Sequence, residues 1–140
     1  MGKKGQNKKD GIDEEFVKKG AKNIDEDDVQ KVLDREKEIR ETFEKKGPLA
    51  RFIEDVKLLF SLIGDYWNGN YKEIPWWALS AIVFTLLYVI NPVDLIPDFI
   101  PFVGYVDDAA VVGICLNLVE KELHKYNEWK IAAEGAQSSD

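Results

Sequence analysis

Four aspartates in the second half of the chain are the residues best placed to do chemistry. Asp94 and Asp98 are four residues apart, and Asp107 and Asp108 are neighbours. Mg²⁺ and Ca²⁺ prefer oxygen ligands, so a chain that folds back between the two pairs could assemble a divalent cation site. The spacing of an EF-hand is absent, and no histidine is close enough in sequence to complete a transition-metal site. We therefore predict no metal and no cofactor, and we keep these four aspartates as the candidate ligands to test.

Helix capping explains the same aspartates without a ligand. Asp94, Asp98 and Asp107 each stand where a helical turn could begin, and a carboxylate there accepts hydrogen bonds from the free N–H groups of the first turn. Asp108 would lie in a first turn, where the helix dipole favours negative charge. Capping is the interpretation that the sequence favours.

The charge pattern leaves these carboxylates without a local partner. From Glu73 to Glu120 the chain contains no Lys, Arg or His. A carboxylate in apolar surroundings is costly unless it is paired, so its partner must come from another part of the chain. Arg51 and Lys57 are the best-placed cations, and we predict that Arg51 contacts one of the four aspartates. An Arg51→Ala variant with an unchanged melting temperature would contradict this prediction.

Apolar residues recur at helical spacing before the aspartates. Asp25 is a candidate N-cap for a charged first helix over residues 26–46, and Gly47-Pro48 ends it. A second helix, over residues 48–66, carries a regular apolar stripe.

The third and fourth predicted helices flank the aspartates. Residues 75–90 are apolar on every face, so this third helix must be buried by protein or by lipid, and Pro92 ends it. The fourth helix begins near Asp107 and continues to about Trp129. No segment alternates as a strand does. The predicted fold class is all-α, a small four-helix arrangement, with a flexible tail over residues 1–23, one helical domain over 24–131 and a second tail over 132–140.

A corner rich in proline and aspartate joins the third helix to the fourth. Its three prolines fix φ and remove backbone donors, and the residue before each proline is steered away from the α region. The predicted structural corner is Asn91, Pro92, Asp94, Pro97, Asp98, Pro101, Gly104, Asp107 and Asp108. We expect a rigid, sharply bent link.

The stretch from Tyr88 to Asp108 resembles the signature of the YkvA-like family, a bacterial domain of unknown function. It reads YVINPVDLIPDFIPFVGYVDD and is similar to the pattern Y-x-x-x-P-x-D-x-I-P-D-x-I-P-x-x-G-x-x-D-D. The wider resemblance covers roughly residues 71–120. It implies a helical hairpin and, for many members, association with a membrane. It implies no known reaction, substrate or cofactor.

Composition excludes several functions. The net charge of −7 argues against nucleic-acid binding, which needs a basic surface. Cys115 is the only cysteine, so no intramolecular disulfide can form, and its apolar neighbours indicate a buried, inert thiol. His124 lies on a charged turn and is expected to face solvent. Because no nucleophile with a base and no phosphate-binding loop is recognisable, we predict that the protein is not an enzyme.

The apolar third helix raises the question of a membrane. Residues 74–93 carry no charge, which meets the usual length for a span, but the helical part is roughly 24 Å against the ~30 Å of a bilayer core. The aromatic residues around its start resemble an interfacial belt, although core packing explains them too: Tyr66, Trp67, Tyr71, Trp76 and Trp77. A soluble or peripheral bundle is favoured over insertion.

These observations predict a non-enzymatic helical module for protein interaction or membrane association. The alternative is a soluble module whose acidic corner binds a divalent cation or a basic segment of a partner. The expected partners are a membrane or a protein, and neither nucleic acid nor a known small-molecule substrate. No signal peptide is recognisable, so we expect a cytoplasmic protein, with association with the inner membrane or insertion into it left open.

Overall fold

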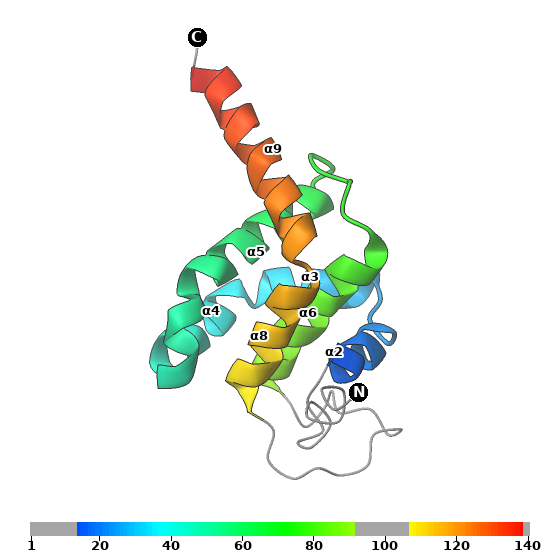
Figure 1. Ribbon diagram of the computed structural model, residues 1–140, viewed down its shortest axis with the longest axis vertical. Helices are drawn as coiled ribbons and strands as arrows, with labels where there is room; N and C mark the ends of the chain where they lie inside the picture. The colour runs from blue at the N-terminus through cyan, green and yellow to red at the C-terminus, as the bar shows by residue number, and fades with distance from the viewer. Residues whose placement is uncertain (1–13, 92–106, 139–140) are drawn as a thin grey trace, which may run out of the picture.

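Every element of the described structure is a helix, which confirms the predicted all-α class (Figure 1). The computed structural model describes residues 14–91 and 107–138. In chain order the elements are α2 (Glu14–Ala21), α3 (Glu26–Asp34), α4 (Glu36–Lys45), the 3₁₀ helix η1 (Gly47–Phe52), α5 (Ile53–Trp67), α6 (Trp76–Ile90), α8 (Asp108–Leu118) and α9 (Glu120–Ser138). The predicted four-helix arrangement is therefore too coarse, because its first, second and fourth helices are each divided in two and α2 precedes them.

Helix α6 is the centre of the bundle. Every residue from Ala78 to Val89 is buried, as expected for a helix that is apolar on all faces. Helices α2, α3, α4 and α8 all pack against it, and Figure 1 shows it running through the middle of the molecule. The protein itself thus supplies the apolar environment that α6 needs.

Proline and asparagine set the ends of α6. Pro75 is the N-cap, with extended backbone angles (φ −68°, ψ 152°), so the helix begins at Trp76. Asn91 is the C-cap, and its N–H donates to the Leu87 carbonyl over 2.9 Å. These bounds agree with the predicted range of 75–90.

The predicted first helix is interrupted at Arg35. Asp25 caps α3 as expected: its carboxylate accepts from the Asp28 N–H at 3.1 Å, and the Asp28 carboxylate accepts from the Asp25 N–H at 3.0 Å. Arg35 then departs from helical geometry (φ −108°, ψ 21°), which separates α3 from α4. Because the chain changes direction at this break, α3 and α4 can both pack against α6.

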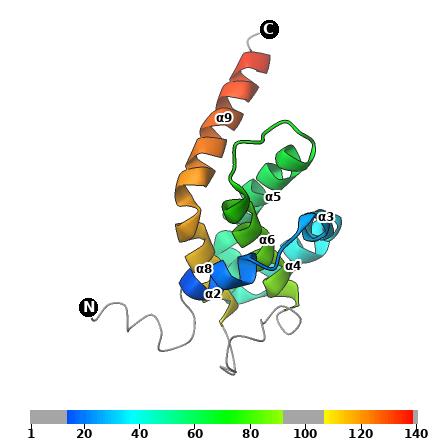
Figure 2. The same cartoon turned by 90° about the vertical axis from the view of Figure 1, so that its right-hand side faces the viewer.

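The predicted fourth helix is also interrupted, at the buried Val119 (φ −101°, ψ 14°), and it extends further than expected. α9 runs to Ser138, so the prediction of a tail over residues 132–140 is wrong for the helical part. The second half of α9 projects from the bundle in Figures 1 and 2, and Ile131 on it is 61% exposed.

Helix α2 corrects the other predicted tail. Residues 1–23 were expected to be flexible, but Glu14–Ala21 is helical and packs against α6. Phe16 contacts the edges of the Phe84 and Tyr88 rings, with centroids 5.8 and 5.7 Å apart. Val17 is fully buried. The apolar face of α2 is short, but it completes the covering of α6.

Candidate functional site

Only the two ends of the Pro/Asp corner lie within the described residues. Asn91 ends α6 and is exposed, and Asp107 and Asp108 begin α8. The remaining positions of the predicted corner lie outside the described residues: Pro92, Asp94, Pro97, Asp98, Pro101 and Gly104.

Asp107 and Asp108 have separate structural roles. Asp107 is the N-cap of α8, and its Oδ1 accepts from the Ala109 N–H at 3.0 Å, as predicted. The Asp108 Oδ2 accepts from the Lys46 Nζ at 2.9 Å. The Asp108 side chain is 17% exposed and that of Lys46 is 51% exposed, so the ion pair lies at the edge of the bundle. Lys46, the C-cap of α4, is thus the cation that faces this carboxylate.

The predicted partner of the aspartates was Arg51. Its guanidinium carbon lies 4.7 Å from the centre of the neighbouring Phe52 ring, and among the described aspartates Asp108 pairs with Lys46 instead. Lys57, the other expected cation, pairs with Glu54 at 3.2 Å. A contact of Arg51 with Asp94 or Asp98 lies outside the described residues and stays a prediction.

Only Asp107 and Asp108, two of the four candidate metal ligands at the corner, lie within the described residues. Within residues 14–91 and 107–138, no three His, Cys, Asp or Glu side chains are arranged to hold a metal ion. Asp107 and Asp108 already bind a backbone N–H and an ammonium. A role for Asp94 and Asp98 as ligands falls outside this range.

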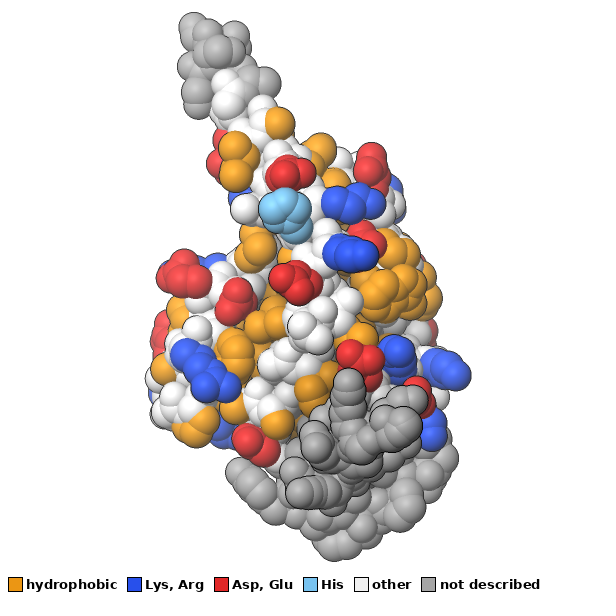
Figure 3. All heavy atoms as spheres, in the orientation of Figure 1, with side chains coloured by type: hydrophobic (Ala, Val, Ile, Leu, Met, Phe, Trp, Pro, Cys, Tyr) orange, Lys and Arg blue, Asp and Glu red, His pale blue; other side chains and the backbone are white. Residues whose placement is uncertain are grey.

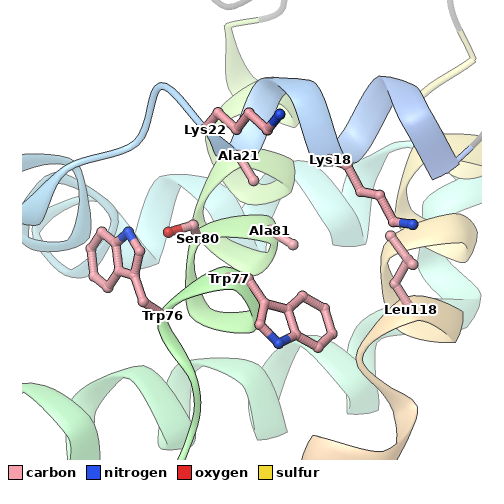
Figure 4. Close-up of a pocket in the computed structure, with 8 residues that line it drawn as sticks. All are labelled: Lys18, Ala21, Lys22, Trp76, Trp77, Ser80, Ala81 and Leu118. Carbon is pink, nitrogen blue, oxygen red and sulfur yellow. The ribbon is translucent and has the colours of Figure 1, made fainter.

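A pocket on another face of the bundle brings together residues that the sequence did not connect. It has a volume of about 520 Å³ and lies between α2, the first turns of α6 and the end of α8 (Figure 4). We call it the tryptophan–lysine pocket; its lining residues are Lys18, Ala21, Lys22, Trp76, Trp77, Ser80, Ala81 and Leu118. This volume is within the range of small-molecule sites in proteins.

Helical spacing places the lining residues on facing sides. Lys18 and Ala21 are three residues apart on α2, so they share one face of that helix, and Lys22 lies in the turn that directly follows it. Trp77, Ser80 and Ala81 likewise share one face of α6. Figure 4 shows the two lysines on the α2 side and the two indole rings on either side of Ser80 and Ala81.

The tryptophans are exposed because they occupy the first turn of α6, which extends beyond its buried part. Trp76 is 41% exposed and Trp77 is 50% exposed, among the most exposed large apolar side chains of the described structure. Figure 3 shows a hydrophobic patch on its right-hand side, where Figure 1 places the start of α6, with Lys or Arg side chains below it, towards α2. This combination of exposed indoles and lysines distinguishes the pocket from an ordinary gap in packing.

The polar groups of the pocket are few and predominantly basic. Among the residues that the structure describes, Lys18 and Lys22 are its charged lining residues, and no acidic residue lines it. Lys18 makes a long ion pair of 3.9 Å with Glu14, and both side chains are about half exposed. Ser80 is 1% exposed, and its hydroxyl has no hydrogen-bond partner among the described residues. A buried hydroxyl without a partner is unusual, because leaving it unpaired costs about 1–3 kcal/mol.

The residues of the predicted aromatic belt are partly buried and partly exposed in the structure. Tyr71 is buried against the Tyr126 and Trp129 rings, with centroids 5.0 Å from each, so it belongs to the core. Burial, and then the nearby Glu73 and Glu122, raise the pKa of Tyr71. Trp67, at the end of α5, is 40% exposed.

One polar cluster was missed altogether. The Tyr126 hydroxyl donates to the Asp65 Oδ2 at 2.5 Å, and the Ser61 Oγ lies 2.6 Å from the same hydroxyl. Because Tyr126 uses its proton for Asp65, Ser61 donates to Tyr126. Burial and the bond to Asp65 raise the pKa of Tyr126. Ser61 and Asp65 are four residues apart on α5, a spacing that could have indicated a shared polar contact.

The expectations for cysteine and histidine are confirmed. Cys115 is fully buried, and its thiol donates to the Ala81 carbonyl over 3.5 Å. Burial raises its pKa to about 12, so the thiol stays protonated and inert. His124 is exposed on α9 beside Glu128, with 3.1 Å between its Nε2 and the Glu128 Oε2.

Comparison with known proteins agrees with the resemblance seen in the sequence. The model of a family described as "Protein of unknown function (DUF1232)" matches residues 78–114. The chain is also 35% identical over 87 residues to the "Uncharacterized membrane protein YkvA" of Bacillus subtilis (strain 168), an alignment that covers 62% of this chain and 82% of that protein. The chain belongs to the YkvA-like family. No solved structure matches it.

The family match includes the corner but only part of the tryptophan–lysine pocket. The residues matched by the family model include most of α6 and the first part of α8, and therefore both ends of the corner. Ser80 and Ala81 of the tryptophan–lysine pocket also lie within this match, whereas its lysines precede it. Among the described helices of this YkvA-like chain, none is long and apolar enough to cross a membrane.

Proposed function

We propose that this chain is a non-enzymatic module that associates with the surface of an anionic membrane through the tryptophan–lysine pocket and its rim. The observation that carries this proposal is the exposure of Trp76 and Trp77 beside Lys18 and Lys22. The relative from Bacillus subtilis is named a membrane protein, which supports this proposal.

The physical basis is the preference of these side chains for the boundary between water and lipid. Indole rings are amphipathic and concentrate at the level of the lipid headgroups. Lysine buries its aliphatic stem against apolar surface and keeps its ammonium group in the polar layer. Near an anionic surface each lysine contributes about 1 kcal/mol, so Lys18 and Lys22 together favour binding by about 2 kcal/mol, or roughly 30-fold.

The charge of the whole chain opposes this attraction. The net charge is −7, so an anionic membrane should bind only the face where the lysines gather. Added salt screens charges beyond about 10 Å at 0.1 M, which weakens the attraction and the repulsion together but leaves the indole contribution. Binding should therefore depend on both lipid charge and the two tryptophans.

Vesicle flotation tests the proposal. The chain should float with vesicles of phosphatidylglycerol and phosphatidylcholine more than with phosphatidylcholine alone. A double variant, Trp76→Ser with Trp77→Ser, should lose most of the floated fraction. The control is Ile131→Ser, which removes a more exposed apolar side chain from α9. Equal flotation of the double variant and the control, or no flotation of the native chain with either vesicle, would contradict the proposal.

The proposal that the chain does not catalyse has separate support. The Ser61–Asp65–Tyr126 cluster is the polar group with the shortest contacts in the described structure, and each of its members is at least half buried between α5 and α9. Its serine donates its hydrogen bond to the tyrosine hydroxyl and not to the Asp65 carboxylate, so no described base activates it as a nucleophile. The raised pKa of Tyr126 also keeps this phenol protonated.

The alternative of an acidic corner that binds a cation or a basic segment has no comparable observation. It stays a prediction for Asp94 and Asp98. Chemical-shift changes at these aspartates on addition of Ca²⁺ or Mg²⁺ would support it.

A further inference from the structure

We propose that the tryptophan–lysine pocket binds one acyl chain of an anionic membrane phospholipid, with the headgroup phosphate held by Lys18 and Lys22. This inference rests on the proposed function and deepens it. Surface association needs only exposed indoles and lysines, whereas this proposal assigns a defined ligand to a defined cavity.

The size and lining of the pocket suit an acyl chain. Its volume of about 520 Å³ is typical of a small-molecule site, and its walls are Ala21, Ala81, Leu118 and the two indole rings. Ala21 and Ala81 are buried and small, so they leave room where larger side chains would fill the space. Removing apolar walls from water lowers the free energy, and an acyl chain in the pocket would cover these walls.

The charges at the pocket select the headgroup. Within the described part of the chain both charged lining residues are lysines, whereas the chain as a whole has a net charge of −7. Lys22 is exposed and makes no ion pair with the described residues. The one ion pair of Lys18 with a described residue is the exposed pair with Glu14, and such a pair is worth less than about 1 kcal/mol. Both ammonium groups can therefore turn to a phosphate.

The position of Ser80 adds an independent indication of a ligand. Its side chain lines the pocket, it is 1% exposed, and its hydroxyl lacks a partner among the described residues. Figure 4 shows this hydroxyl directed towards the side of Trp76, between the two indole rings. A hydroxyl with unused bonding capacity at this place fits a polar glycerol or ester group next to the acyl chain.

The neighbouring indoles favour a lipid from a bilayer over one from solution. Trp76 and Trp77 line the pocket and are also exposed, so the surface that would enter the headgroup layer is the mouth of the cavity. An acyl chain could then enter without crossing water.

A titration of the full chain with monomeric single-chain lipids tests the inference. The probe is dodecanoyl lysophosphatidylglycerol below its micelle concentration, and the readout is the four indole N–H signals in a nitrogen–proton correlation spectrum. Binding should saturate at one lipid per chain and shift the signals of Trp76 and Trp77 while leaving that of Trp129 in place. Dodecanoyl lysophosphatidylcholine, whose headgroup is zwitterionic, should bind about tenfold more weakly, and inorganic phosphate should cause no shift.

Two variants separate the cavity from its charged rim. Ala21→Leu fills the cavity and should abolish binding of the lysolipid, while vesicle flotation is retained. Lys22→Glu changes an exposed side chain and should preserve the fold even if Ala21→Leu disturbs it. It should weaken lysolipid binding about tenfold. The matched control is Lys37→Glu on α4, an exposed lysine that does not line the pocket and gives the same change in net charge.

The outcomes distinguish this inference from the proposed function. Equal affinity for both lysolipids, unchanged binding by Ala21→Leu, or shifts at all four indoles would overturn the inference and leave surface association intact. Lysolipid binding without vesicle flotation would show an amphiphile site supplied from solution, which overturns the assignment to a membrane lipid.

Discussion

The contact between Gly20 and Phe84 gives the most direct test of how α2 is held. A Cβ atom added at Gly20 would lie 2.3 Å from both Cε1 and Cζ of the Phe84 ring. This ring cannot turn aside freely, because it packs on Phe16 and Tyr88 with centroids 5.8 and 6.0 Å away. We therefore predict that Gly20→Ala separates α2 from α6 or displaces the ring.

The magnitude follows from two opposing effects. Replacing glycine by alanine within a helix stabilises the folded chain by up to about 1 kcal/mol. Forcing a methyl group into a filled contact costs about 1–3 kcal/mol, and a separation of 2.3 Å places Gly20→Ala at the upper end. The expected net effect is a loss of about 2 kcal/mol in the free energy of unfolding.

Urea unfolding measures this loss against a matched control. Gly64→Ala is the same substitution in α5, where nothing lies within 4 Å of the added Cβ, so it should stabilise the chain by up to about 1 kcal/mol. A double-mutant cycle with Phe84→Leu then isolates the contact. Shortening the ring should recover about 1–2 kcal/mol of the loss, because the two substitutions are in direct contact.

Two results would refute this reasoning. If Gly20→Ala stabilised the chain as much as Gly64→Ala, α2 would not be packed on Phe84. If the cycle with Phe84→Leu were additive, the loss would arise elsewhere. Either result would also remove the support of the tryptophan–lysine pocket, since Lys18 lies on α2 and Lys22 directly follows that helix.

Three further predictions concern residues outside this contact. Tyr126→Phe removes the hydrogen bond to the Asp65 carboxylate and should lower the free energy of unfolding, measured in urea, by about 1.5–3 kcal/mol. Because the pKa of Tyr126 is raised in the folded state, the native chain should also lose stability as the pH rises above about 10, the ordinary tyrosine value, and the variant should lose less. A double-mutant cycle of Lys46→Ala and Asp108→Asn should give a coupling of less than about 1 kcal/mol, since the pair is half exposed on the lysine side; a coupling of several kcal/mol would contradict this. Cys115, with its pKa raised to about 12, should react with a thiol reagent at pH 8 only after unfolding in urea, and rapid labelling of the native chain would show that the thiol is not buried.

The parts of the fold that could be predicted are those fixed by local chemistry. The bounds of α6 follow from an apolar run between Pro75 and Pro92, because proline can begin a helix but not continue one. The caps at Asp25 and Asp107 follow from carboxylates placed just before apolar helical patterns. In these places the sequence alone determines the structure.

The parts that could not be predicted depend on distant packing. α2 has only two large apolar residues in eight, and its contact with Phe84 uses a glycine, which reads as a linker residue when taken alone. The breaks at Arg35 and Val119 carry no proline or glycine, so nothing local marks them. They can be explained only once it is known that α3, α4 and α8 pack against α6.

The same dependence on distant packing means that the tryptophan–lysine pocket could not be predicted from the sequence. The corner drew notice because its residues are unusual and adjacent, yet Asp107 and Asp108 prove to be a cap and an ion-pair partner. The pocket is made by three helices far apart in sequence. Its one local signal was the spacing of Lys18, Ala21 and Lys22, which is meaningless if the segment is taken as a tail.

The burial of α6 decides which apolar groups are left for a membrane. The helix has 15 residues and is about 22 Å long, shorter than the ~30 Å bilayer core, and protein covers it from Ala78 to Val89. Lipid could replace that covering only by displacing α2, α3, α4 and α8 together. The first turn of α6 requires no such change, because Trp76 and Trp77 are already exposed. Association through this turn, Lys18 and Lys22 therefore preserves the whole described core, which is why we propose the membrane contact there.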